Sequence, residues 1–245
     1  MLYDSRMEKK KVTVVMPAYF AEKTLEKTYK DIPKTYVDEI ILVDDASKDK
    51  TVEIAKKLGL NVIVHKKNKG YGANQKTCYI AALKGKADII VLLHPDYQYD
   101  PKKIPRLIKP IQEDNADVVY GSRMLTKGGA KRGGMPWWKR LGNRALTLYF
   151  KLFLKIKITD AATGYIAYSR KVLETIPFMR NSNGMTFDEE AMIQIASKKF
   201  RIAEIPIPTK YEDVSSSTSF PNCIKYGIRL FWKIVRYKLH FNINI

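Results

Sequence analysis

The first half of the chain alternates short apolar runs, rich in β-branched and aliphatic residues, with longer segments of helical character. The apolar runs span residues 12–16, 39–43, 61–64, 88–93 and 117–120. Runs of this length predict strands, and those over residues 12–16 and 39–43 are expected to be buried. The segments between them predict helices over residues 22–31, 49–58, 70–83 and 101–114. Strands that alternate with helices of this size predict β-α-β units and a mainly parallel sheet.

Two residues mark the ends of the helix predicted over residues 49–58. Ser47 precedes it and is a candidate N-cap, because a serine hydroxyl can accept a hydrogen bond from a free backbone N–H group at a helix start. Gly59 follows it, at the position where a left-handed glycine commonly ends a helix.

The second half of the chain is less regular. Its predicted elements are a basic glycine-rich loop over residues 127–134, helices over 137–154 and 185–198, and strands over 162–168 and 202–207. We expect one α/β domain over residues 1–213, followed by a loop and a tail helix over residues 214–245.

The predicted tail helix, over residues 222–240, is amphipathic and basic. Its apolar positions recur every three or four residues, at Ile224, Ile228, Phe231, Val235 and Leu239. Its cations are Lys225, Arg229, Lys233 and Arg236. Such a helix suits an anionic membrane surface, and it equally suits packing against its own domain or a second subunit.

The whole chain is strongly basic, with 44 Lys and Arg against 25 Asp and Glu and a net charge of +19. This charge favours polyanionic partners such as nucleic acid, nucleotides or an anionic membrane, and it also fits a lysine-rich solvated surface. No recognised nucleic-acid-binding motif is present, so we expect no specific binding of nucleic acid.

Cysteine usage and hydropathy point to a reducing compartment. Cys78 and Cys223 lie far apart with no Cys-x-x-Cys pattern, which disfavours a disulfide framework and a structural zinc site. The N-terminus lacks the apolar core of a signal peptide, and no apolar run could span a bilayer. We expect a cytoplasmic protein, either free or attached to the cytoplasmic face of the membrane.

Residues able to carry chemistry follow each predicted strand. They are Pro17, Ala18 and Tyr19, Asp44 and Asp45, residues 66–70, His94 and Asp96, and Gly121, Ser122 and Arg123. In a parallel sheet these positions meet at the carboxyl edge, where ligands bind. Acids and cations gathered there suit a nucleoside diphosphate and a metal ion. A phosphatase or a receiver domain would also fit a carboxylate cluster with magnesium.

Several nucleotide-binding and hydrolytic motifs are missing. The first strand is not followed by Gly-x-Gly-x-x-Gly, which disfavours a dinucleotide site. No P-loop and no nucleophile elbow occur, and the three histidines are too scattered for a histidine metal site.

Eight sequence blocks, taken in order, resemble a known enzyme family. They are VTVVMPAYFAE, EIILVDDASKD, NKGYGAN, VLLHPDYQYDP, YGSRM, DAATGY, FDEEAMIQ and RIAEIPIPTKY. The chain resembles the family 2 inverting glycosyltransferases over roughly residues 11–211, and most closely their dolichyl-phosphate mannosyltransferase-type branch. The resemblance implies the GT-A fold, a Rossmann-like, mixed but mainly parallel sheet flanked by helices. It also implies transfer of a sugar from a UDP- or GDP-sugar to a polyprenyl phosphate or a membrane glycan.

The resemblance also implies roles for individual residues. The expected nucleotide pocket consists of Pro17, Ala18, Tyr19, Glu22, Asp44, Asp45, Asn68, Lys69 and Gly70. Within it, Asp45 is expected to accept a hydrogen bond from the base. His94 stands where the family has the first aspartate of its DxD motif, so Asp96 is the expected ligand of Mg²⁺ or Mn²⁺, helped by Gln98. His94 is either a further ligand or a neighbouring, capping residue, and an imidazole would favour manganese.

Further residues are expected on the acceptor side. Arg123 is expected to bind a phosphate of the donor or acceptor. Lys127, Lys131 and Arg132, on the glycine-rich loop, are expected to act as a lid and to hold an acceptor phosphate. A lipid phosphate needs no general base, whereas a sugar hydroxyl does. The candidates for that base are Asp160, Asp188, Glu189 and Glu190.

Two other functions remain open. One is transfer to a soluble sugar or polysaccharide hydroxyl with Asp188 or Glu190 as base. The other is a catalytically silent nucleotide-sugar-binding protein, because His94 breaks the DxD pair.

Overall fold

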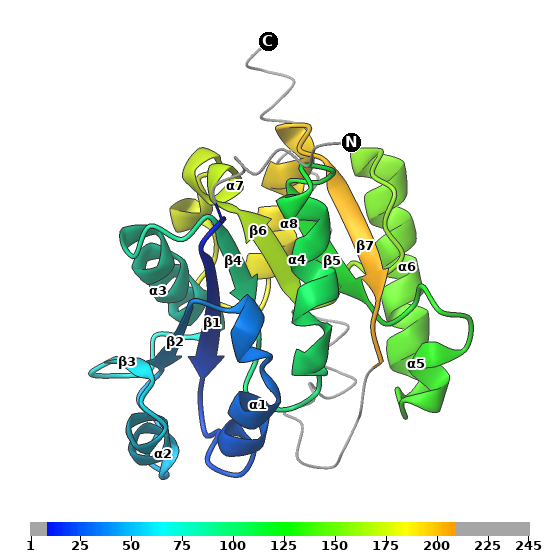
Figure 1. Cartoon of the computed structure of the whole chain (residues 1–245). Helices are drawn as coiled ribbons and strands as arrows, with labels where there is room; N and C mark the ends of the chain where they lie inside the picture. Colours follow the sequence, from blue (N-terminus) through cyan, green and yellow to red (C-terminus); the bar gives the residue numbers. More distant parts are fainter. Residues whose placement is uncertain (1–8, 209–245) are drawn as a thin grey trace, which may run out of the picture.

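The computed structural model describes residues 9–208, which form an α/β fold around one sheet (Figure 1). The tail helix predicted over residues 222–240 and the domain boundary predicted at residue 213 lie outside the described residues. The predicted division into two parts therefore stays a prediction.

The described residues form one seven-stranded sheet with strand order β3-β2-β1-β4-β6-β5-β7. The strands are β1 (Val12–Ala18), β2 (Glu39–Asp44), β3 (Asn61–Val64), β4 (Ile89–Leu92), β5 (Val118–Ser122), β6 (Ile166–Ser169) and β7 (Ile202–Pro206). Strand β6 runs antiparallel to β4 and β5, and the other neighbouring pairs are parallel. The predicted mixed, mainly parallel sheet is confirmed.

Helices cover both faces of this sheet (Figure 1). The helices are α1 (Leu25–Asp31), α2 (Thr51–Lys57), α3 (Tyr71–Lys84), α4 (Ile104–Gln112), α5 (Gly129–Arg132), α6 (Trp137–Leu154), α7 (Arg170–Thr175) and α8 (Phe187–Ser197). Short 3₁₀ turns are η1 (Lys34–Tyr36), η2 (Pro101–Lys103) and η3 (Phe178–Arg180). Helices α1, α2 and α4 pack on one face, and α3, α6, α7 and α8 pack on the other.

The central strands supply both layers of the core. In β1, Val14 and Met16 join the layer under α1, α2 and α4, whereas Val15 joins the opposite layer. Successive side chains of a strand point to opposite faces, so a continuous apolar run fills both layers. Each fully buried aliphatic side chain contributes about 1.5–3 kcal/mol. This burial explains why apolar runs identified the central strands, whereas β3 and β7, at the two edges of the sheet, are only partly buried.

Two local predictions are wrong. The strand predicted over residues 162–168 begins only at Ile166, because Thr163 and Gly164 hydrogen-bond outside the strand ladder. Ser47 is not the cap of α2, which begins at Thr51 after Lys50. The Ser47 hydroxyl instead accepts a hydrogen bond from the backbone of Phe20, which joins the turn after β2 to the turn after β1. Gly59 has a φ of 71°, as predicted.

The glycine-rich segment 127–134 is more ordered than the predicted loop. Its centre forms one helical turn, α5, which starts after Gly128 at a φ of 72°. Ala130 in this turn is buried. The segment is therefore fixed to the domain at one point along its length.

Helices α3 and α8 approach each other closely at Gly72. The backbone N–H of Gly72 donates to the carbonyl oxygen of Asn183 at 2.8 Å. A Cβ atom at Gly72 would lie 2.3 Å from the carbonyl oxygen of Ser182 and 2.8 Å from the Cβ of Phe187. Only glycine fits this contact without moving the loop that precedes α8.

We expect Gly72→Ala to lower the free energy of unfolding by about 1–3 kcal/mol, the usual cost of overpacking. Gly142 is the matched control, because it lies within α6 and a Cβ there would meet nothing within 4 Å. Gly142→Ala should be neutral or stabilising by up to about 1 kcal/mol. Urea unfolding measures both, and equal effects of the two substitutions would contradict the close contact.

Candidate active site

The strand topology brings the predicted site residues to one edge of the sheet. Ala18 at the end of β1 pairs with Asp44 at the end of β2, and β4 runs parallel beside β1. Because β6 is antiparallel to both β4 and β5, β5 ends at the same edge. The segments after β1, β2, β4 and β5 and the segment before β6 therefore meet there.

Asp45 organises the nucleotide side of this edge. Its carboxylate is buried and accepts hydrogen bonds from the backbone N–H groups of Lys69 and Gly70, both at 2.9 Å. Its Oδ1 atom also lies 2.7 Å from Nδ1 of His65. Asp45 therefore holds the loop over residues 66–70 against β2. The predicted hydrogen bond from a base would have to reach its Oδ2 atom, which accepts only one of these contacts.

The other predicted nucleotide residues surround this loop. Pro17 and Ala18 are buried in β1, and Asp44 is buried and accepts a hydrogen bond from the backbone of Ser47. Glu22 accepts a hydrogen bond from the backbone of Lys50, so it joins the turn before α1 to the start of α2.

Other predicted nucleotide residues at this edge of the sheet are exposed to solvent. Tyr19 is 52% exposed at the end of β1, and Asn68 and Lys69 are exposed on the loop. The side chain of Asn68 accepts a hydrogen bond from the backbone N–H of Gly70 at 3.0 Å. The exposed ring of Tyr19 and the polar loop form a surface on which a planar base could stack.

The DxD-like segment follows β4. Asp96 is partly exposed, and its Oδ1 atom accepts a hydrogen bond from the backbone of Gln98 at 3.0 Å. Among residues 9–208, no three His, Cys, Asp or Glu side chains converge as a metal site. The carboxylate of Asp96 is still a suitable hard ligand, because a divalent cation bound to a diphosphate takes most of its ligands from phosphate oxygens and water.

His94 contacts two residues from distant parts of the chain. Its Nε2 atom lies 3.1 Å from the hydroxyl of Tyr71, and the two rings stack with centroids 5.4 Å apart. The Tyr71 hydroxyl donates to Oδ2 of Asp188 at 2.6 Å. Burial raises the pKa of Asp188, although the hydrogen bond from Tyr71 acts to lower it. Burial, and next the charge of Asp188, also raise the pKa of Tyr71.

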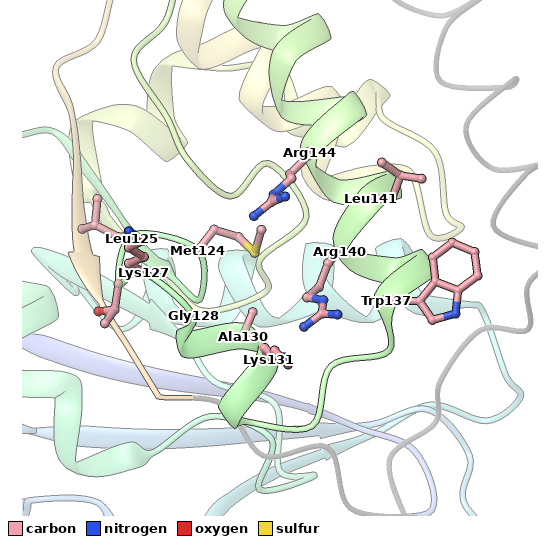
Figure 2. Close-up of a pocket in the computed structure, with 11 residues that line it drawn as sticks. Met124, Leu125, Lys127, Gly128, Ala130, Lys131, Trp137, Arg140, Leu141 and Arg144 are labelled. Carbon is pink, nitrogen blue, oxygen red and sulfur yellow. The ribbon is translucent and has the colours of Figure 1, made fainter.

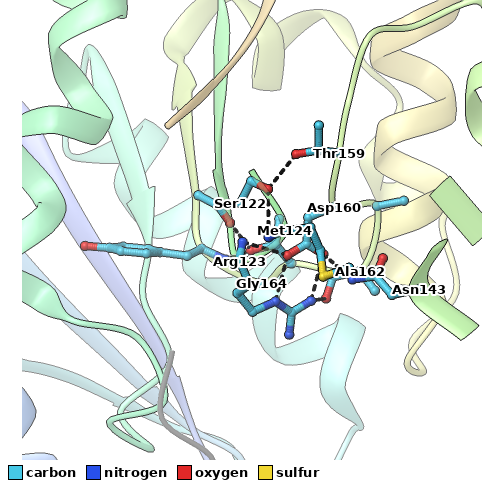
Figure 3. A network of polar contacts seen from close by, with 12 residues as sticks. Ser122, Arg123, Met124, Asn143, Thr159, Asp160, Ala162 and Gly164 are labelled. Carbon is cyan, nitrogen blue, oxygen red and sulfur yellow. Dashed lines mark hydrogen bonds and ion pairs between the residues drawn. The ribbon is translucent and has the colours of Figure 1, made fainter. Parts of the chain in front are cut away.

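Arg123 and Asp160 form a buried ion pair (Figure 3). Arg123 donates from Nε to Oδ2 of Asp160 at 2.7 Å and from Nη2 to Oδ1 at 2.8 Å. The same Nη2 atom donates to the carbonyl oxygen of Ala162, and Asn143 of α6 donates to Oδ1 of Asp160 at 2.7 Å. The pair thus joins the end of β5, the segment before β6, and helix α6.

This geometry favours a structural role for Asp160 over that of a general base. Burial by itself raises the pKa of Asp160, but the charge of Arg123 and the hydrogen bonds from Arg123 and Asn143 outweigh it and lower the pKa. Asp160 is completely buried, and both of its oxygens accept hydrogen bonds. The predicted phosphate contact of Arg123 stays a prediction, with Nε and Nη2 of its guanidinium already bonded.

The acids of α8 differ in their surroundings. Glu190 accepts hydrogen bonds from the backbone of Ser182 at 2.9 Å and from the hydroxyl of Thr186 at 2.7 Å, so it holds its own loop together. Glu189 is buried. Asp188 is the one of these three acids that bonds to Tyr71 and, through it, contacts the DxD-like segment.

A groove lies between residues 124–131 and helix α6 (Figure 2). Its volume is about 720 Å³, and its walls are Met124, Leu125, Thr126, Lys127, Gly128, Ala130, Lys131, Trp137, Arg140, Leu141 and Arg144. A smaller pocket of about 220 Å³ shares Met124 and Arg144 with it. The groove contains the predicted Lys127 and Lys131. Arg132 does not line it and instead donates to the carbonyl oxygen of Lys127.

The sequence patterns did not reveal four residues of this region. His65 and Tyr71 orient Asp45 and His94, and Asn143 supports Asp160. Tyr99 is buried, and its hydroxyl accepts the backbone N–H of Gly164 at 3.0 Å. Tyr71 lies within the block NKGYGAN, and Tyr99 lies within VLLHPDYQYDP. Their position in blocks that resemble the family was the only sequence feature that could have marked them as site residues.

The fold is of the GT-A class. Solved structures of glucosyl-3-phosphoglycerate synthase from Mycobacterium tuberculosis have a similar fold. The structure with UDP gives a TM-score of 0.72 at 18% identity, covering 93% of this chain and 79% of that chain. The structure with Mn²⁺, UDP and glucosyl-3-phosphoglycerate gives 0.68 at 19% identity, covering 92% and 80%.

The sequence comparison identifies the family. Residues 13–177, more than half of the chain, match the family described as Glycosyl transferase family 2, and the chain belongs to this family. An uncharacterised protein of Methanocaldococcus jannaschii is 33% identical, covering 96% of this chain and 95% of that protein. The UDP-N-acetylglucosamine–dolichyl-phosphate N-acetylglucosaminyltransferase of Methanococcus voltae is 29% identical, covering 95% and 98%. The dolichyl-phosphate hexose transferase of Haloferax volcanii is 32% identical, covering 80% and 82%.

We expect Asp160→Asn to lower the free energy of unfolding by about 3–5 kcal/mol, because it leaves the buried charge of Arg123 without its partner. Asp114→Asn is the control, since Asp114 pairs with Arg201 but its side chain is 81% exposed. That substitution should cost less than about 1 kcal/mol. Urea unfolding at neutral pH compares them, and an Asp160→Asn variant as stable as the control would contradict the structural role of the ion pair.

Proposed function

We propose that the protein transfers a sugar from a nucleoside diphosphate sugar to a polyprenyl phosphate, with inversion at the anomeric carbon. The observation that carries the proposal is the groove beside α6, which combines apolar walls with four cations and no acid. The names of the relatives from Methanococcus voltae and Haloferax volcanii, both dolichyl-phosphate glycosyltransferases, support the same acceptor class.

The groove matches the two chemical halves of a polyprenyl phosphate. Its cations, Lys127, Lys131, Arg140 and Arg144, suit the phosphate, because guanidinium groups bind phosphate oxygens in pairs. Apolar side chains on α6 suit the isoprenoid chain. Trp137, Leu141, Leu148 and Leu152 lie on one side of this helix and are 57–68% exposed.

The same helix supports attachment to a membrane surface. An exposed apolar stripe bordered by Arg140, Arg144 and Lys151 is typical of helices that lie in the interface of anionic lipid. No helix within residues 9–208 has the length and apolar character needed to cross a bilayer. On the basis of the exposed apolar stripe and its bordering cations, we propose that α6 faces the lipid that carries the acceptor.

A phosphate acceptor is consistent with carboxylates that are engaged in hydrogen bonds within the protein. A phosphate monoester is already anionic at neutral pH and can attack the anomeric carbon without losing a proton to the protein. Asp160 and Glu190 are both held by hydrogen bonds within the structure. A hydroxyl acceptor would require a carboxylate that is free to take a proton. Asp160 and Glu190 do not supply one, and the third candidate, Asp188, accepts a hydrogen bond from Tyr71.

On the donor side, we propose that the edge formed by β1, β2 and β4 holds a UDP- or GDP-sugar. The loop held by Asp45 and the exposed ring of Tyr19 border the base and ribose. Asp96 would hold a divalent cation, Mg²⁺ or Mn²⁺, and its open position supports this role. When bound, the cation would neutralise the charge that develops on the leaving diphosphate. Neighbours of this fold were crystallised with Mn²⁺ or Mg²⁺ and UDP.

A donor screen with polyprenyl phosphate in vesicles tests the proposed reaction. We expect one UDP- or GDP-sugar to give a glycosylated lipid, identified by mass spectrometry. Asp96→Ala should lower the rate by about 100-fold or more, because it removes the cation ligand. Glu113→Ala, which removes an exposed carboxylate at the end of α4, is the control and should leave the rate unchanged. Transfer to soluble glycans alone would contradict the proposed acceptor, and full activity of Asp96→Ala would contradict the role of Asp96.

If the groove binds the acceptor, removing its cations should weaken binding of polyprenyl phosphate but not of the donor. The double substitution Arg140→Ala with Arg144→Ala should raise the KM for polyprenyl phosphate about 10-fold or more, since each lost phosphate contact costs about 1 kcal/mol or more. The KM for the donor should change little. The control, Lys84→Ala with Lys171→Ala, removes the same charge from exposed positions on α3 and α7 that do not line the groove. Equal effects of the two double variants would show that only the overall charge matters.

A further inference from the structure

The hydrogen bonds around Tyr71 define the protonation of His94. The single hydroxyl hydrogen of Tyr71 is donated to Oδ2 of Asp188, at 2.6 Å. The oxygen of the same hydroxyl lies 3.1 Å from Nε2 of His94. Because its hydrogen is used toward Asp188, this oxygen accepts, and Nε2 of His94 carries a hydrogen. In the neutral imidazole the lone pair is then on Nδ1.

The ring of His94 is also held by packing. It stacks on the ring of Tyr71 with an angle of 14° between the planes. On another side lies Gly164, where an added Cβ would come within 3.1 Å of Cδ2 and Nε2 of His94. Contacts therefore fix the Cδ2 and Nε2 edge of the ring. Nδ1 lies on the other edge, and no hydrogen bond to it occurs among the described residues.

Asp96 lies two residues further along the same segment. It is partly exposed, and Oδ1 accepts one hydrogen bond, from the backbone of Gln98. Both residues follow β4 at the carboxyl edge of the sheet. A ligating histidine usually donates its other ring N–H to a hydrogen-bond acceptor of the protein, which fixes the tautomer and the ring orientation. The pair Tyr71 and Asp188 supplies this arrangement for His94.

We propose that Tyr71 and Asp188 are positioning residues that fix the Nε2–H tautomer of His94 and present its Nδ1 atom, together with Asp96, to a divalent cation. The sequence HPD would then replace two carboxylates by one carboxylate and one oriented imidazole. A site of this composition binds manganese better than magnesium, because imidazole suits transition metals. The inference rests on the proposed use of a cation with the donor diphosphate.

Metal binding tests the role of Tyr71 without an activity assay. Mn²⁺ is titrated in the presence of UDP and of GDP and followed by electron paramagnetic resonance. We expect Tyr71→Phe to weaken Mn²⁺ binding by about 10- to 100-fold, the usual effect of removing a hydrogen-bond partner of a ligand. Tyr29→Phe is the matched control, because Tyr29 is a partly buried tyrosine on α1, on the opposite face of the sheet.

A double-mutant cycle separates orientation of His94 from a general loss of structure. In the background of His94→Ala, Tyr71→Phe should have no further effect on the binding of Mn²⁺. Equal weakening in both backgrounds would overturn the inference. Wild-type protein that binds no Mn²⁺ with either nucleotide would overturn both the proposed cation and this inference. Binding that Tyr71→Phe leaves unchanged would overturn the inference alone.

Nuclear magnetic resonance of the wild-type protein tests the tautomer directly, without a variant that could fail to fold. Long-range ¹H–¹⁵N spectra distinguish the two neutral tautomers of a histidine from the doubly protonated ring. His94→Ala identifies the signals. We expect Nε2 to carry the hydrogen and Nδ1 to shift when a diamagnetic transition-series cation such as Zn²⁺ is added with UDP. Observation of the Nδ1–H tautomer would overturn the proposal.

Discussion

The buried ion pair between Arg123 and Asp160 is the interaction on which the acceptor side of the molecule depends. It joins the end of β5 to the segment before β6, and Asn143 extends the connection to α6. Charges removed from water must keep their partners, so this geometry permits little variation. Of the two walls of the groove, residues 124–131 directly follow Arg123, and α6 contains Asn143. The ion pair therefore connects the two segments that carry the groove's cations.

On the proposed donor side, hydrogen bonds between distant segments likewise fix the positions of the site residues. Asp45 holds the loop before α3, α3 begins with Tyr71, and Tyr71 contacts the segment after β4. Tyr99 connects the two sides, because its hydroxyl accepts the backbone N–H of Gly164 and its ring lies 6.0 Å from the guanidinium carbon of Arg123. The proposed donor and acceptor sides are thus both positioned by polar contacts between distant segments of the chain. This suits a reaction in which two substrates must be aligned along one line of attack.

The carboxylates illustrate how burial selects a role. Sequence alone cannot distinguish a base from a structural acceptor, since both are Asp or Glu after a strand or at a helix start. In the structure Asp160 is completely buried and accepts hydrogen bonds from Arg123 and Asn143, whereas Asp96 stays partly exposed with one hydrogen bond, from the backbone of Gln98. Such a distribution fits an anionic nucleophile, for which charge neutralisation and alignment matter more than proton removal.

The amino-acid sequence by itself determined the strands, most of the helices, the family, and the edge of the sheet where the chemistry lies. This was possible because apolar runs, glycines at helix ends and the order of motifs can be read directly from the sequence. Only the tertiary structure decided where β6 begins, at Ile166, and that residues 129–132 form the turn α5. It also decided the hydrogen-bond partners of Asp45, His94 and Asp160. Tyr71 and Asp188 are 117 positions apart, and no local pattern encodes their contact. The role of a buried polar side chain depends on which residues neutralise its charge or orient it. These residues come together only when the chain folds.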